Sequence, residues 1–106
     1  MTIRQKKVAE LIHKLAAEYV SREANSLSMI TVTGADISRD LVNAKVFFTV
    51  LPEDKEESAS EFLERKKYDF REYVRKSTSL KILPKIDFAL DLGEKNRQRI
   101  EELSKK

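Results

Sequence analysis

Two alternating apolar segments, joined by a short polar connection, constrain the fold more than any other feature of the chain. Residues 27–37 alternate around β-branched side chains, and residues 44–51 resume the alternation. The apolar face of the second segment consists of Ala44, Val46, Phe48 and Val50. Because the connection SRDLVN is only a few residues long, the two segments are predicted to form an antiparallel hairpin.

Helical periodicity flanks this hairpin on both sides. In residues 3–20 apolar side chains recur at spacings of three and four, which predicts a first helix. Pro52 ends the second strand because it has no N–H to donate, and a second helix is predicted to follow and to end near Lys76. Acidic residues gather at the start of this helix, and Ser58 with Glu61 has the spacing of a capping box.

The segment after Pro84, KIDFALD, alternates again and predicts a third strand. Gly93 breaks the chain, so residues 1–92 are expected to form one domain and residues 93–106 a short helical tail that is partly frayed. The order helix, strand, strand, long helix, strand, short helix predicts an α+β fold. In such a fold the helices pack on one face of a three-stranded sheet.

The composition narrows the class of protein. The chain has no cysteine, which excludes a disulfide framework, a thiolate metal site and a cysteine nucleophile. No apolar run approaches the roughly 18 residues that a membrane span needs, and the N-terminus lacks the apolar core of a signal peptide. A soluble, cytoplasmic protein without a membrane partner is expected.

Residue types that carry catalysis or bind metals are sparse. His13 lies off the apolar stripe of the first helix, where a surface residue is the simplest interpretation. The pairs Asp36–Asp40 and Asp87–Asp91 lack the further ligands of a metal site. Two isolated glycines cannot make a glycine-rich phosphate loop. No enzymatic activity, cofactor, metal or small-molecule substrate is therefore expected.

Positive charge concentrates between residues 65 and 85. This stretch has eight basic and two acidic residues, a net charge of +6, so the other 85 residues sum to −3. Such a segment can neutralise backbone phosphates, although a run of charge can also be no more than a solvated helix face. An acidic run at residues 53–64 opposes it, and this asymmetry favours an oriented approach to a polyanion.

Two lysines interrupt the apolar stripe of the second helix. At roughly 100° per residue from Phe62, Lys66 falls near the centre of the stripe, at about 40°, and Lys67 at its edge, at about 140°. A solvated face does not explain lysines in these positions. Either their stems snorkel along apolar neighbours, or the helix bends there and turns the lysines and free backbone N–H groups outward toward an anion.

Phe47 lies on the strand face opposite Val46 and Phe48, beside Lys45. An exposed aromatic ring next to a cation can stack on a nucleobase, whereas a covering helix or terminal segment would make the ring part of the packing. The sequence leaves both interpretations open.

Several strings, in order and at matching spacing, resemble the ribosome-binding factor A family. KKVAELI, residues 6–12, is similar to the family's opening helix motif, and LKILPKIDFALD, residues 80–91, resembles its last strand. The hairpin shares a serine, an Asp-Leu pair and Ala-Lys-Val, here Ser38, Asp40–Leu41 and Ala44–Lys45–Val46. With Arg99–Ile100 matching the start of the closing segment, the resemblance spans nearly the whole chain.

The resemblance implies a type II K-homology (KH) domain whose long helix is interrupted. It places the interruption at Lys66, Lys67 and Tyr68, where the family commonly has small residues. This chain departs from that pattern at all three positions, and the departure adds positive charge at the same place.

The function that the resemblance implies is that of a non-enzymatic factor for ribosome biogenesis. Such a protein binds the immature small ribosomal subunit through its ribosomal RNA, assists late maturation and processing of the RNA 5′ region, and is associated with growth in the cold. A cytoplasmic monomer is expected. Phosphate contacts are expected from Lys66, Lys67, Arg71, Arg75, Lys76, Lys81, Lys85 and Lys45, and secondary contacts from Arg4, Lys6 and Lys7.

Two other interpretations stay open at this point. The chain can be a KH-type module for single-stranded nucleic acid with no link to ribosomes. It can also be a protein-interaction domain whose exposed sheet edge recruits a peptide strand.

Overall fold

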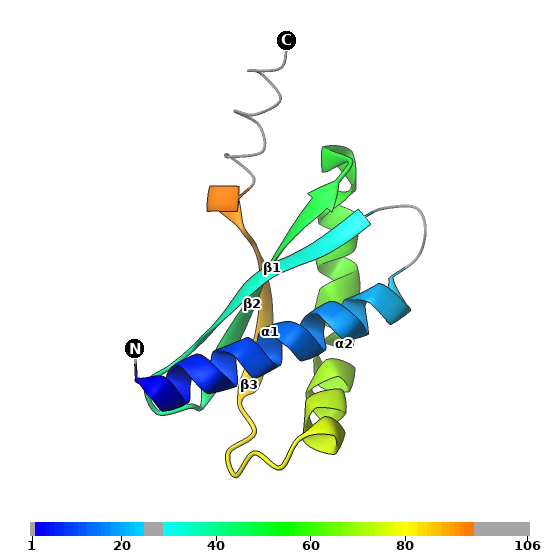
Figure 1. Ribbon diagram of the computed structural model, residues 1–106. Coiled ribbons are helices and arrows are strands. Elements are labelled where there is room, and N and C mark those ends of the chain that lie inside the picture. The colour runs from blue at the N-terminus through cyan, green and yellow to red at the C-terminus, as the bar shows by residue number, and fades with distance from the viewer. Residues whose placement is uncertain (1, 25–28, 95–106) are drawn as a thin grey trace.

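The computed structural model describes residues 2–24 and 29–94, which fold into helices and one three-stranded sheet (Figure 1). The elements in chain order are α1 (Ile3–Glu23), β1 (Met29–Ile37), β2 (Asn43–Leu51), the short 3-10 helix η1 (Glu53–Lys55), α2 (Glu56–Ser77) and β3 (Lys85–Leu90). The α+β class and the predicted order of these elements are confirmed. None of the helices in the described part of the chain is long and apolar enough to cross a membrane.

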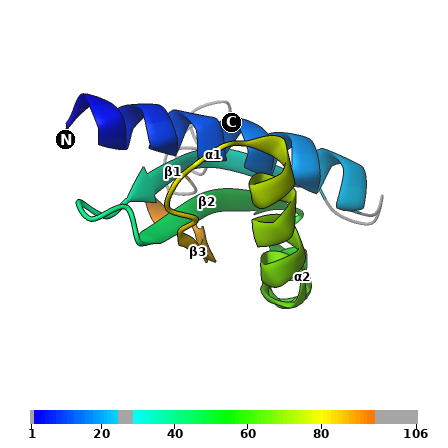
Figure 2. The ribbon, with the colours of Figure 1, turned by 90° about the horizontal axis from the view of Figure 1, so that it is seen from below.

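β2 is the central strand of the sheet. It pairs with β1 in the antiparallel sense, which confirms the predicted hairpin, and with β3 in the parallel sense. Two parallel neighbours cannot be joined by a tight turn, so the chain must cross over between them, and α2 forms this crossover. In Figure 2 α1 lies along the sheet and α2 stands at its side.

A bulge at Thr33 lets β1 keep its apolar side chains on the core face. Val32 pairs with Phe48 and Gly34 with Phe47, so Thr33 is the extra residue of β1. The alternation of side chains shifts by one residue at this point. The residues of β1 that pack against the core on either side of the bulge are Ile30, Val32, Ala35 and Ile37.

Both helices contribute to a single core on one face of the sheet. The core-facing residues of β2 are the four predicted ones, and those of α1 and α2 include Ile12, Ala16, Tyr19, Leu63, Phe70 and Val74. The ring of Phe70 lies 5.2 Å from that of Tyr19 on α1 and 5.7 Å from that of Phe88 on β3, measured between centroids. Phe70 therefore joins both helices to the third strand.

Every residue of α2 from Glu56 to Ser77 is helical, which corrects the interruption that the family resemblance implied at residues 66–68. The reason is local, because the helix contains no glycine or proline and neither lysine nor tyrosine breaks a helix. The capping box predicted for α2 is wrong as well. Ser58 Oγ donates to the carbonyl of Lys55 instead of capping the helix.

The capping box that the structure does contain opens α1. Gln5 N donates to Thr2 Oγ1 at 3.1 Å, and Thr2 N donates to the Gln5 side chain at 3.0 Å. These two bonds satisfy N–H groups that have no partner within the helix, which fixes the first turn of α1.

Asp91 holds the end of β3. Its Oδ2 accepts a hydrogen bond from Thr33 Oγ1 at 2.6 Å, and its Oδ1 accepts one from Glu94 N at 3.0 Å. The latter bond caps a helical turn at residues 92–94. The rest of the predicted helical tail lies outside the described residues, so the domain boundary at residue 92 stays a prediction.

Replacing the Asp91 carboxylate is expected to destabilise the fold. Asp91→Ala should lower the free energy of unfolding at pH 7 by about 1–2 kcal/mol, because Thr33 Oγ1 and Glu94 N lose their acceptor. The hydrogen bond from Thr33 is the main cause that lowers the pKa of the Asp91 carboxyl. Since the folded-state pKa is the lower one, this stability is present above the unfolded-state pKa of about 3.9 and is lost as the pH falls through the folded-state value.

Urea unfolding at pH 7 and at about pH 3 measures this effect. The difference between the native protein and Asp91→Ala should shrink on acidification. Asp54→Ala is the matched control, because Asp54 is exposed in η1, just after β2, and has no side-chain hydrogen bond among the described residues. A difference for Asp91→Ala that is the same at both pH values would contradict the role of the ionised carboxylate.

Candidate nucleic-acid interface

One end of the sheet brings together segments that are far apart in the sequence. α1 begins there, and the side chain of Gln5 donates to the carbonyl of Ile37 at the end of β1. β3 also begins there, with Lys85 beside Asn43 of β2. The last turns of α2 and the connection to β3 lie at the same end (Figure 1). We call this region the basic end, and its cations are Arg4, Lys6, Lys7, Arg39, Arg71, Arg75, Lys76, Lys81 and Lys85.

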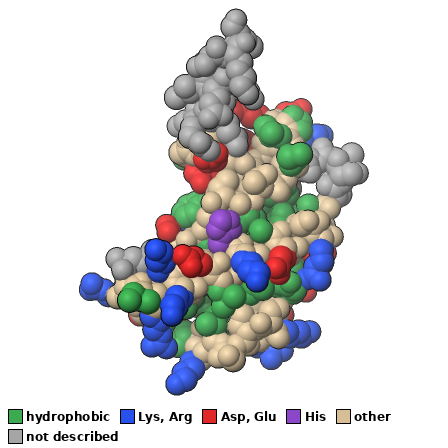
Figure 3. Space-filling view, in the orientation of Figure 1, with side chains coloured by type: hydrophobic (Ala, Val, Ile, Leu, Met, Phe, Trp, Pro, Cys, Tyr) green, Lys and Arg blue, Asp and Glu red, His purple; other side chains and the backbone are tan. Residues whose placement is uncertain are grey.

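The opposite end of the molecule is acidic. η1 and the first turns of α2 carry Glu53, Asp54, Glu56, Glu57 and Glu61. In the view of Figure 3, most Lys and Arg side chains lie in the lower half of the molecule, with a few acidic side chains between them, and other acidic side chains lie toward the top. This charge separation gives the molecule an electric dipole, which orients it toward a polyanion with the basic end first.

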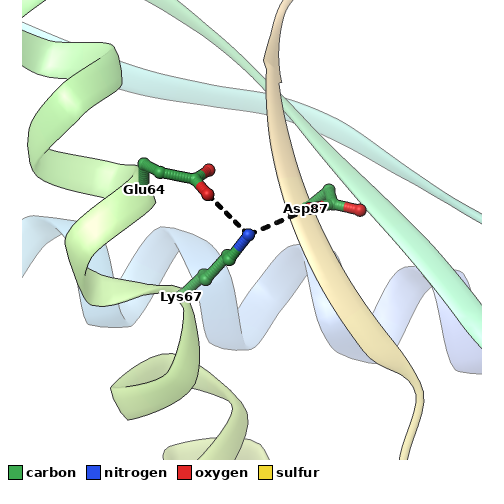
Figure 4. A network of polar contacts seen from close by, with 3 residues as sticks. All are labelled: Glu64, Lys67 and Asp87. Carbon is green, nitrogen blue, oxygen red and sulfur yellow. Dashed lines mark hydrogen bonds and ion pairs between the residues drawn. The ribbon is translucent and has the colours of Figure 1, made fainter.

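Lys66 and Lys67 leave the apolar stripe in different directions. Lys66 Nζ lies 3.7 Å from Glu23 at the end of α1, and Lys67 Nζ lies 3.6 Å from Asp87 on β3 and 2.5 Å from Glu64 (Figure 4). Their side chains are 37% and 20% exposed. Both lysines therefore snorkel. Their stems are partly covered by neighbouring side chains, and the helix continues through both residues.

The ammonium of Lys67 is held by carboxylates of its own chain. The hydrogen bond to Glu64 is the main cause that raises the pKa of Lys67. A phosphate that binds Lys67 would have to compete with Glu64 and Asp87, and one that binds Lys66 would have to compete with Glu23. These two ammonium groups are therefore less available to a phosphate than their charge alone predicts.

Arg71 is a clamp for the connection between α2 and β3. Its Nε donates to the carbonyl of Pro84 and its Nη2 to the carbonyl of Leu83, each at 3.0 Å. Two of the five N–H donors of the guanidinium are thus spent on the backbone, and the others remain for a ligand. The sequence pattern predicted a phosphate contact for Arg71, which stays a prediction, and missed the bonds to the backbone.

Exposed cations without a carboxylate partner form the most accessible part of the basic end. Lys76, Lys81 and Lys85 are exposed, and none of the three has an ion pair within residues 2–24 and 29–94. Arg75 is also exposed and pairs with Glu72 at 2.8 Å on the same helix. That mutual hydrogen bond raises the pKa of Arg75 and lowers the pKa of Glu72.

Lys45 lies on the sheet face that the helices leave open. In the strand register it stands between Asp36 of β1 and Asp87 of β3. These two carboxylates offset its charge, so the structure does not join Lys45 to the exposed cations at the end of α2.

The predicted secondary contacts lie on the first turns of α1. Arg4, Lys6 and Lys7 are exposed, and this first turn has no acidic residue. Arg39, in the connection between β1 and β2, is exposed at the same end of the sheet and was missed. Its position becomes evident only when the hairpin is placed against the start of α1.

A hollow of about 250 Å³ opens between α2 and the start of β3. Its lining consists of Lys67, Tyr68, Arg71, Lys85, Ile86 and Asp87. Tyr68, which projects away from the core, is 72% exposed. The sequence pattern predicted phosphate contacts from the three cations and no binding role for Tyr68, because the strand that completes the hollow comes 17 residues later in the chain.

The remaining candidates do not add to this surface. Phe47 is half-buried, neither fully covered nor fully exposed, and its strand neighbours on the open face are Gly34 and Ala89. His13 is half-buried on α1. No group of three or more side chains in the described ranges is placed to hold a metal ion.

The fold and the basic end together define a class, a small α+β domain whose surface suits a polyanion. The family model for ribosome-binding factor A matches residues 4–104, and the chain belongs to this family. Ribosome-binding factor A of Coxiella burnetii is 34% identical over 102 residues, which cover 94% of this chain and 86% of that protein.

Two solved structures share the fold. The crystal structure of ribosome-binding factor A from Thermus thermophilus matches with a TM-score of 0.71 and 19% identity, over 81% of this chain and 94% of that one. A Thermus thermophilus model fitted into the cryo-EM map of a 30S–RbfA complex matches with a TM-score of 0.67 and 20% identity, over 76% and 88%.

The clamp formed by Arg71 can be tested by its effect on stability. Arg71→Ala should lower the free energy of unfolding by about 1.5–3 kcal/mol, because two hydrogen bonds from a charged donor to backbone carbonyls are lost. Arg71→Lys should recover little of this, since an ammonium cannot reproduce the forked geometry. Urea unfolding measures both variants.

Lys76→Ala is the control for this experiment, because Lys76 lies on the same helix and is exposed. Its free energy of unfolding should change by no more than about 0.5 kcal/mol. If Arg71→Ala were as stable as Lys76→Ala, the clamp would not contribute to the fold.

Proposed function

We propose that this protein is a ribosome biogenesis factor that binds the immature small ribosomal subunit through its ribosomal RNA. In this role it assists late maturation of the subunit and processing of the RNA 5′ region. It acts without catalysis or a cofactor, as a monomer in the cytoplasm. The observation that carries the proposal is the cluster of exposed cations at the basic end of a chain that belongs to the ribosome-binding factor A family.

Two further points support the proposal. The fitted Thermus thermophilus protein is described as part of a 30S complex, and we extend that partner to this chain. In addition, a surface of lysines and arginines meets phosphates without reading a sequence, as an RNA-binding assembly factor requires when it recognises a folded particle.

We rank the predicted contacts by exposure and by ion pairing. Lys76, Lys81 and Lys85 are exposed and have no ion pair among the described residues, and together with Arg4, Lys6 and Lys7 they are the principal phosphate ligands in our proposal. Arg71 contributes the donors that its clamp leaves over. Arg75, Lys66, Lys67 and Lys45 have a smaller part, because carboxylates of the same chain lie beside them.

This ranking changes which variants test the proposal. Lys76→Ala and Lys81→Ala should each lower the salt dependence of binding to immature small subunits, the slope of log K against log salt, by about one unit. Arg71 is unsuitable for this test because its loss also disturbs the connection to β3. Sedimentation with immature subunits at several salt concentrations provides the measurement.

Lys55→Ala is the matched control, since it removes one exposed lysine at the acidic end. Its slope should equal that of the native protein. Equal slopes for Lys55→Ala, Lys76→Ala and Lys81→Ala would show that the basic end does not meet the phosphates. Tight binding to short oligonucleotides with no binding to subunits would favour the single-stranded nucleic-acid module instead.

A further inference from the structure

The hollow between α2 and β3 has one wall that differs from the rest of the basic end. Tyr68 is the one aromatic ring of its lining, and it is 72% exposed. The other two tyrosines are held in the fold, since Tyr19 is buried and donates to Asp69 and Tyr73 stacks near Phe70. The ring of Tyr68 is therefore available to a ligand.

Three cations share the hollow with this ring. Lys67 Nζ lies 5.6 Å from the centroid of Tyr68, within the range of a cation–π contact, and Arg71 and Lys85 line the same hollow. Asp87 is the one acid of the lining, and Lys67 lies 3.6 Å from its carboxylate. With three cations and one carboxylate, the lining of the hollow has a net positive charge.

The size and openness of the site limit the ligand. A hollow of about 250 Å³ is smaller than the roughly 300–1,000 Å³ of sites that enclose a drug-sized molecule. It suits a single planar group that enters from a longer chain. An exposed aromatic face beside cations is the arrangement with which proteins hold an unpaired base and the phosphate next to it.

We propose that this hollow binds one unpaired nucleotide of RNA, with its base stacked on Tyr68 and its phosphate contacted by Lys85 and by the remaining donors of Arg71. This inference rests on the proposed function, because the RNA of the immature subunit is the chain from which the nucleotide comes. It goes beyond phosphate neutralisation, since a stacked base makes the protein prefer a single-stranded segment over a duplex at this point of the surface.

A solvated surface tyrosine is the competing explanation. It predicts that the ring can be removed without consequence for binding. It does not explain why the exposed ring stands at the one place where α2, Lys85 and the clamp of Arg71 meet.

The test compares Tyr68→Ala and Tyr68→Phe with the native full-length protein. The probes are a short single-stranded RNA oligomer of mixed sequence and immature small subunits. Tyr68→Ala should weaken binding to the oligomer by about 5- to 150-fold, the range measured for loss of one stacked base, whereas Tyr68→Phe should bind nearly as the native protein does. Because no charge is removed, the salt slope of Tyr68→Ala should stay unchanged.

Both variants are expected to fold as the native protein does. Tyr68 is exposed and lies within α2, and alanine has a higher helix propensity than tyrosine. Ile82→Ala is the matched control, because it removes a large exposed side chain from the connection between α2 and β3. Its affinity for both probes should equal that of the native protein.

Tyrosine fluorescence gives a second readout. The chain has three tyrosines and no tryptophan, so stacking of a base on Tyr68 should quench part of the tyrosine emission when RNA binds. Tyr68→Phe should lose this quenching and keep its affinity. A purely structural tyrosine would not give that combination.

Two failures can be told apart. If Tyr68→Ala binds both probes as tightly as the native protein, the nucleotide site is wrong, while the salt slopes of Lys76→Ala and Lys81→Ala still decide the proposed function. If the native protein does not bind immature subunits, the proposed function is wrong, while the oligomer still decides whether Tyr68 stacks on a base.

Discussion

The packing of Phe70 is the interaction on which the rest of the structure depends. Its ring is fully buried between Tyr19 of α1 and Phe88 of β3, so one side chain sets the position of α2 against the other helix and against an edge strand. Two rings at such distances add to the hydrophobic gain of burial. Since Phe70 is one residue before Arg71 and two after Tyr68, the same contact turns these two side chains toward the start of β3.

The separation of charge follows from the topology. β3 is parallel to β2, so the chain must return along the length of the sheet, and α2 makes that return. The acidic N-terminal turns of α2 therefore lie at one end of the molecule. Its basic C-terminal turns lie at the other end, where α1 and β3 also begin. Acids near the N-terminus and cations near the C-terminus of α2 also complement the helix dipole, so the arrangement that directs the molecule toward a polyanion costs α2 no stability.

Much of the fold could be predicted, because the spacing of apolar residues along the chain identifies each helix and strand from local sequence. Alternation located the hairpin and the third strand, and a period of 3.6 located both helices. The bulge at Thr33 was missed because one extra residue leaves each half of the strand alternating normally. The site was harder to predict. The charge of Lys67 is local information, but its pairing with Asp87 depends on a strand 20 residues away, and the same holds for the clamp of Arg71 and the hollow beside Tyr68.

The continuity of α2 decides what kind of contact this surface can make. In an unbroken helix each backbone N–H beyond the first turn is bonded to the carbonyl four residues earlier, so the N–H groups near residue 67 are not available to an anion. A helix that breaks there would present free backbone groups, whereas α2 is helical at every residue and presents side chains. The chain carries two lysines and a tyrosine at that point, followed by Arg71 one turn later. Recognition through these groups uses charge and an aromatic face, and a rigid helix holds both against β3 before any ligand arrives.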